Sequence, residues 1–149
     1  MSRTRTDSRL APSITPTTLA PSRRRVRRAA TVVFAVLAAV LAWIVVVPLL
    51  GVELVVTGPD GAIGPVSVVA VAGAALLAGA AGWALLAVLE HVTRSAAPAW
   101  TVIAGTVLVV SLAGPLTAGT VAAMVSLIAL HMIVGVVVAV GLRRSGGRR

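Results

Sequence analysis

The sequence predicts an all-α integral membrane protein, a bundle of four transmembrane helices with both termini in the cytoplasm. Of its 149 residues, 58% are hydrophobic and only 11% are charged. A soluble fold of this size would lack the polar surface needed to cover its core. The thirteen basic residues are all arginine, and they lie before residue 29, at Arg94 and after residue 142. The stretches between these arginines are apolar and long.

These apolar stretches have the length of membrane spans. A helix rises about 1.5 Å per residue, so about 20 residues cross a hydrocarbon core of about 30 Å. Within a transmembrane domain at 29–144, the sequence predicts spans at about 29–50, 65–89, 99–118 and 120–142. The third span is the shortest and the weakest. For the first span we favour an uncleaved anchor over a signal peptide, whose apolar region covers only about 7–15 residues.

Polar segments flank and join the spans. Residues 1–28 are rich in Ser, Thr, Pro and Arg and predict a disordered cytoplasmic tail. Residues 145–149 form a second short tail. The turn signals of residues 51–64 predict a flexible loop, and Pro65 suits the first position of the next helix. Pro48 withholds an N–H, so the first helix is expected to kink or end there.

The distribution of arginine orients the chain. In a four-span topology, the N-terminal tail, the Arg94 loop and the C-terminus fall on one side with every arginine. The 51–64 loop and the 114–119 turn fall on the other side with none. Cytoplasmic loops carry the excess of Lys and Arg. We therefore expect a multi-pass protein of the cell membrane with both ends inside.

His131 is the one ionisable residue deep in a predicted span. It lies roughly 16 Å from the inner end of the fourth span, near the bilayer midplane. Ionisable side chains at that depth are costly and usually face the bundle interior. Ser111 lies at a similar depth and Thr106 adds a second hydroxyl, so these three residues form a candidate intramembrane polar site. We favour a structural interpretation, in which a neutral His131 joins the third and fourth helices by a hydrogen bond, over a proton or ligand site.

Small residues are concentrated in the second span. Ala75 and Gly79 lie four residues apart, as do Ala78 and Gly82. This spacing forms a ridge of small side chains that lets helix backbones approach closely. It predicts helix packing, and we favour packing within the chain over packing between copies because no Gly-xxx-Gly pair occurs in this span.

A basic run precedes the first span, and its residues are Arg23, Arg24, Arg25, Arg27 and Arg28. We interpret it first as a topology signal and second as a binding surface for anionic lipid head groups. No aromatic residue is interleaved to stack on bases, so we expect no nucleic acid partner.

Residues near the inner ends of the spans suggest local roles. Glu90 and His91 are placed to cap a helix or to pair with Arg94. Trp100 suits an anchor at the membrane interface, whereas Trp43 and Trp83 lie deeper and are expected to pack.

The chain offers no recognisable catalytic machinery. It contains no Cys, which excludes thiolate metal sites and thiol catalysis. Phosphate loops, zinc-ligand spacings and Ser-His-Asp arrangements are absent from the sequence, and Glu90 with His91 lacks a nucleophile. We therefore expect no cofactor and no enzymatic activity.

Four apolar stretches carry a family resemblance: residues 42–54, with AWIVVVPLLGVEL; residues 76–89, with AGWALL at 81–86; SLAGPL at 111–116; and residues 130–143, with LHM at one end and GLR at the other. Together they resemble a family of small four-span membrane proteins of unknown function found mainly in actinobacteria. The resemblance covers about residues 29–144. It implies a membrane location and four helices, and it supplies no substrate or catalytic residue.

Three functions fit the sequence. The first is a non-catalytic protein that packs with itself or with a membrane partner, and it rests on the scarcity of polar groups and on the small-residue ridge. The second is a small transporter or channel-like subunit that uses His131, Ser111 and Thr106. The third is a membrane enzyme, which we rank last.

Overall fold

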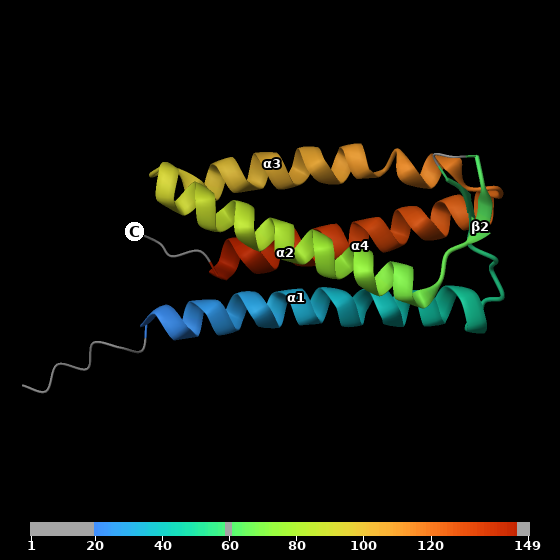
Figure 1. Cartoon of the computed structure of the whole chain (residues 1–149), viewed down its shortest axis with the longest axis horizontal. Helices are drawn as coiled ribbons and strands as arrows, with labels where there is room; N and C mark the ends of the chain where they lie inside the picture. The colour runs from blue at the N-terminus through green and yellow to red at the C-terminus, as the bar shows by residue number, and fades with distance from the viewer. Residues whose placement is uncertain (1–19, 59–60, 146–149) are drawn as a thin grey trace, which may run out of the picture.

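Four long helices run side by side in a bundle in the computed structural model, which describes residues 20–58 and 61–145 (Figure 1). They are α1 (Ala20–Ile44), α2 (Val68–Val92), α3 (Ala96–Ser111) and α4 (Val121–Ser145). With the short helical turns that follow α1 and α3, all four are long and apolar enough to cross a membrane. The described start of α1 and the described end of α4 lie at the same end of the bundle. The predicted all-α, four-span fold class is confirmed.

Helix α1 begins earlier than the sequence predicts. It starts at Ala20, so the tail boundary placed at residue 28 lies too late, and the basic run forms the first turns of a helix. Residues 1–19 lie outside the described part of the chain. At the other terminus α4 continues to Ser145, and residues 146–149 of the predicted tail are not described.

Pro48 changes the end of the first span, as predicted. Residues Val45–Leu49 form a π-helical turn, η1, in which the Leu50 N–H donates to the Val45 carbonyl at 3.0 Å. Proline has no N–H to donate and its ring crowds the carbonyl four residues earlier, so the turn widens there. The helical segment then ends at Gly51, whose φ of 67° is a left-handed conformation that favours glycine.

The segment predicted as a flexible loop is ordered as a β-hairpin in its described residues. Strands β1 (Val55–Thr57) and β2 (Ile63–Pro65) pair antiparallel. Val56 also forms a bridge to Ala118, which follows the 3₁₀ turn η2 (Gly114–Thr117). The hairpin therefore joins α1, α2 and α4 at one end of the bundle, here called the hairpin end. The opposite end, where α1 begins and α4 finishes, is called the arginine end. The flexible-loop interpretation is wrong because β-branched residues on both sides of the turn favour strand pairing.

Pro65 does not begin the second helix. It ends β2, and Ser67 is the N-cap of α2, with its Oγ accepting a hydrogen bond from the Ala70 N–H at 3.2 Å. A serine side chain satisfies one of the free N–H groups at a helix start, which proline does not do. The second span is therefore shifted to Val68–Val92.

Two tryptophans join neighbouring elements through their indole N–H groups. Trp43 Nε1 of α1 donates to the Val66 carbonyl before α2 at 2.9 Å. Trp100 Nε1 of α3 donates to the Ala139 carbonyl of α4 at 3.0 Å. Trp100 is only 3% exposed, so its interpretation as an interfacial anchor is wrong. Trp83 packs against the core as predicted.

Glycines set how closely the helices approach. A Cβ added at Gly141 of α4 would overlap the side chain of Thr31 in α1, and one added at Gly79 of α2 would lie 3.0 Å from Val32 Cγ1. Helix α1 therefore packs tightly against both α2 and α4. Helix α3 packs mainly on α4.

Gly141→Ala should destabilise the bundle, because the added methyl group forces α1 and α4 apart. Overpacking of this kind costs about 1–3 kcal/mol. Thermal unfolding of the purified protein in detergent, followed by circular dichroism, should show a lower midpoint. Gly73→Ala is the matched control, since a Cβ there meets nothing within 4 Å and alanine favours helix. Equal midpoints for the two variants would contradict the close contact.

Candidate functional site

A groove bounded chiefly by α2, α3 and α4, here called the α2–α3 groove, is hollowed into the described part of the protein. Its volume is about 720 Å³. Leu85, Trp100 and Val138 line the part of the groove nearer the arginine end of the bundle. Val56, Pro65 and Val66 line the part at the hairpin end. The wall formed by α2 consists mostly of small residues: Ala70, Ala74, Ala75, Ala78, Ala81 and Gly82. The groove is therefore an apolar site that extends along the bundle.

The groove exists because α3 packs more extensively on α4 than on α2. The Leu108 side chain of α3 packs on Gly135 of α4 so closely that an added Cβ would lie 2.5 Å from Leu108 Cδ1. Nearer the arginine end of the bundle, the Trp100 hydrogen bond to Ala139 also holds α3 against α4. The alanines of α2 are too short to fill the remaining space, and Ala74 and Ala78 stay exposed.

Two of the three predicted polar residues lie in this groove. His131 of α4 and Ser111 of α3 both line it. Each satisfies a hydrogen bond within its own helix: His131 Nδ1 lies 2.8 Å from the Leu127 carbonyl oxygen, and Ser111 Oγ donates to the Leu108 carbonyl at 2.7 Å. The expected hydrogen bond from His131 to the third helix is therefore not formed. Counting residues along the spans predicts that His131 and Ser111 lie at a similar level, and both line the same groove. The count does not predict the rotamers, which direct each hydrogen bond into its own helix.

These hydrogen bonds decide what the two side chains offer to the groove. A carbonyl oxygen only accepts, so Nδ1 of a neutral His131 must carry the proton. Its Nε2 then keeps a free lone pair. Ser111 Oγ uses its proton on Leu108 and likewise keeps lone pairs. With His131 neutral, both residues present acceptors.

Thr106 does not belong to this site. It lies on the other side of α3, where residues of that helix line a shallow hollow of about 550 Å³: Thr101, Val102, Gly105, Thr106, Val109 and Val110. We call this surface the outer face of α3. The sequence grouped Thr106 with Ser111 because both are hydroxyl residues of one span. Five residues of α-helix separate their directions by roughly 140°, which puts them on different faces.

The small-residue ridge of α2 is divided between two roles. Ala75, Gly79 and Gly82 are buried. Gly79 meets Val32 of α1, and Gly82 meets Trp100 and Leu142. Their contacts lie within the chain, the kind of packing that the sequence favours. Ala78 is exposed and lines the groove.

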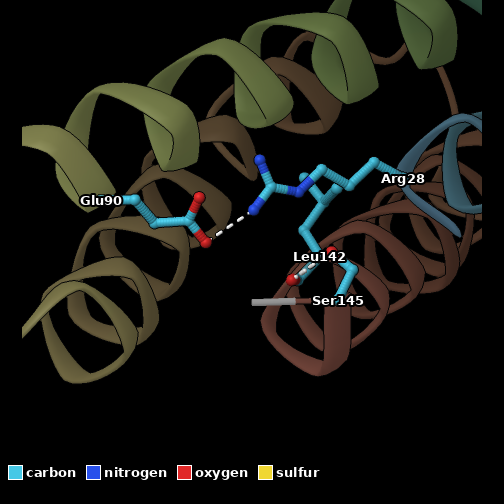
Figure 2. A network of polar contacts seen from close by, with 4 residues as sticks. All are labelled: Arg28, Glu90, Leu142 and Ser145. Atoms are coloured by element: carbon cyan, nitrogen blue, oxygen red, sulfur yellow. Dashed lines mark hydrogen bonds and ion pairs between the residues drawn. The ribbon is translucent and has the colours of Figure 1, made fainter. Parts of the chain in front are cut away.

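The arginine end of the bundle contains a buried ion pair (Figure 2). Arg28 Nη2 of α1 lies 2.6 Å from Glu90 Oε1 of α2, and the two side chains are 7% and 25% exposed. The predicted pairing of Glu90 with Arg94 is therefore wrong. Arg28 is also withdrawn from any head-group surface, whereas Arg23, Arg24, Arg25 and Arg27 are exposed. No periodicity in the sequence distinguishes Arg28, because its partner is 62 residues away.

Glu90→Gln should lower stability, because it leaves the buried Arg28 guanidinium without a counter-charge. An unsatisfied buried group costs about 1–3 kcal/mol. Thermal unfolding in detergent measures the loss. Glu90→Gln in an Arg28→Leu background should cost much less than it does in the native chain. Arg27→Leu, at an exposed position, is the control and should change the midpoint little. Additive effects of Arg28→Leu and Glu90→Gln would contradict the coupling.

Comparison with known proteins places the chain in a family and goes no further. Residues 19–148 match a family of unknown function, DUF6069. No curated protein matches the chain, and no solved structure does. The match extends over the whole described region, which includes the groove, the outer face of α3 and the ion pair. The chain therefore belongs to DUF6069, a family of unknown function.

Proposed function

We propose that this multi-pass membrane protein is non-catalytic and acts by packing in the bilayer, with a second copy of itself or with another membrane protein, through the outer face of α3. The observation that carries this proposal is an exposed face of small and β-branched residues, with Thr106 among them, on the helix that is least buried in the bundle. Gly105 lies at its centre, with open space around a Cβ placed there.

The residues of this face suit a contact between helices. Thr101 and Gly105 are four apart, the small-residue spacing that lets another helix approach closely. Thr106 is exposed, and its hydroxyl has no hydrogen-bond partner among the described residues. Hydrocarbon provides no partner for such a hydroxyl, whereas Ser and Thr side chains form hydrogen bonds across helix interfaces. A partner helix would satisfy Thr106 and cover Gly105.

The proposal includes an orientation. The ends of α1 and α4 that carry Arg23 and Arg143 share one end of the bundle, and the described residues of the hairpin end contain no arginine. By the positive-inside rule, the arginine end faces the cytoplasm. We assign the protein to the cell membrane of an actinobacterium on the resemblance described above. The exposed arginines at the start of α1 then face anionic lipid head groups.

A small transporter or channel-like subunit is the second candidate. His131 and Ser111 support it, since both line the α2–α3 groove. The groove supports it weakly, because Trp100 lines one end and the hairpin lines the other, and because Thr106 lies on the opposite face. A membrane enzyme has less support still, since Glu90 is engaged by Arg28.

Gly105→Leu should disrupt association, because its side chain fills the space that a partner helix would occupy. Native electrophoresis of membranes solubilised in mild detergent should show the native chain above the mass of its monomer. The variant should migrate at monomer mass. Ala129→Leu, at an exposed position of α4 that lines neither hollow, should leave the complex intact. A native chain that migrates as a monomer with no co-purifying protein would refute the proposal.

Accessibility of introduced cysteines should reveal the orientation, and the chain has no native cysteine to interfere. Asp60→Cys should react with an impermeant maleimide on intact cells. Arg94→Cys and Gly146→Cys should react only after permeabilisation, because the arginine end is assigned to the cytoplasm. The reverse pattern would overturn the assignment while leaving the helical bundle unaffected.

A further inference from the structure

The shape of the α2–α3 groove and the two hydrogen-bond acceptors in its lining indicate which class of ligand would fit it. We propose that it binds one long hydrocarbon chain carrying a hydroxyl group on an internal carbon, with the hydroxyl donating a hydrogen bond to His131 Nε2. The ligand enters sideways from the bilayer. This site lies on the side of α3 away from its outer face, so it is separate from the association surface proposed above.

The width of the groove selects a hydrocarbon chain over a helix. Its wall on α2 extends from Ala70 to Leu85, which is roughly 22 Å at the helical rise. A volume of about 720 Å³ open to the centres of water molecules, spread over that length, gives a mean width between the walls of roughly 9 Å once the radius of a water molecule, about 1.4 Å, is added on each side. A helix with side chains is about 10–12 Å wide, too wide to enter. Chain carbons contact their neighbours at about 3.5–4.0 Å, so a single chain fits.

The lining selects an apolar ligand that comes from the membrane. Apart from His131 and Ser111, the side chains that line the groove are hydrocarbon except for the Trp100 indole N–H, which is already bonded to Ala139. Ala74, Ala78 and Ala81 are exposed along the α2 side, so that side is open to the hydrocarbon around the bundle. A ligand dissolved in the bilayer therefore reaches the groove without crossing a polar surface.

The free lone pairs select a hydrogen-bond donor. A neutral His131 and Ser111 both present acceptors to the groove, because each has used its proton on its own helix. A ketone or an ester offers only acceptors and gains nothing from either residue. An ammonium group donates, but a charge at this depth is costly. A hydroxyl is the donor compatible with both the apolar lining and the acceptors.

The position of His131 places the hydroxyl along the chain and not at its end. The groove lining of α4 extends from Leu127 to Val138. His131 is therefore roughly 6 Å from one end of that lining and roughly 10 Å from the other. A chain that fills the groove passes His131 partway along its length. The small-residue wall of α2, which includes Ala78, leaves the space across the groove.

The test uses the full-length protein in phosphatidylcholine nanodiscs. A sixteen-carbon chain with a diazirine group serves as the photolabel, and peptide mass spectrometry measures its incorporation into α2, α3 and α4. Ala78→Phe should reduce labelling of the groove at least tenfold, because the ring projects from a lining position and fills part of the groove. Ala80→Phe is the matched control. Ala80 is exposed on the same helix but does not line the groove, and its substitution should leave labelling within twofold of the native chain.

Competition tests the hydrogen bond separately. Unlabelled hexadecan-6-ol should compete about threefold to tenfold better than hexadecane, the advantage that one net hydrogen bond provides. His131→Leu, which keeps the groove apolar, should remove most of this advantage while the photolabel still binds. Equal labelling of the Ala78→Phe and Ala80→Phe variants would overturn the site. Equal competition by the alcohol and the alkane on the native chain would overturn the hydroxyl assignment. Circular dichroism confirms that each variant is folded.

Discussion

Close contact between helices at glycine is the constraint on which the rest of this structure depends. Hydrocarbon gives apolar helices no hydrophobic reason to associate, so van der Waals packing must hold them together. Gly141 brings α4 against Thr31 of α1, Gly79 brings α2 against Val32, and Gly135 receives Leu108 of α3. Between α2 and α3 the described glycines make one such contact, where Gly82 meets Trp100, and the rest of the space between these helices is hollow. The α2–α3 groove is the result of that uneven distribution.

Polar contacts complete the arrangement at the two ends of the bundle. At the arginine end Arg28 and Glu90 join α1 to α2, and the Trp100 indole N–H donates to the Ala139 carbonyl of α4. At the hairpin end the Trp43 indole N–H donates to the Val66 carbonyl, and Val56 of the hairpin bridges to Ala118. The middle of the bundle is held by apolar packing, and Ser111 and His131 are each hydrogen-bonded within their own helix. The ends therefore fix the register, and the middle can contain a hollow.

The sequence predicts the elements better than it predicts their neighbours. Apolar length gave four helices, and Pro48 gave the end of the first, because both effects act within one segment. The pairing of Arg28 with Glu90 depends on how α1 is rotated against α2, which no local pattern records. The hairpin differs from the predicted flexible loop although Val55 and Val56 precede a Gly-Pro-Asp-Gly sequence. Glycine and proline are equally typical of flexible loops and of hairpin connections, so they do not distinguish the two.

The candidate site illustrates the same limit. Depth along a span is set by residue count, so Ser111 and His131 were placed at one level and the structure brings both to one groove. Thr106 was grouped with them only as a second hydroxyl of the same span, and five residues of helix turn it to another face of α3.

The separation of Thr106 from Ser111 has a consequence for how the two proposed activities relate. Helix α3 presents Ser111 to the α2–α3 groove and Gly105 with Thr106 to the surroundings of the bundle. A chain in the groove and a partner on the outer face therefore touch α3 from different directions and do not compete for the same atoms. Because α3 packs mainly on α4, a chain in the groove adds contacts between α3 and α2 to those that the two helices already make, such as Gly82 with Trp100. Ligand binding and association through α3 are thus sterically compatible on one helix.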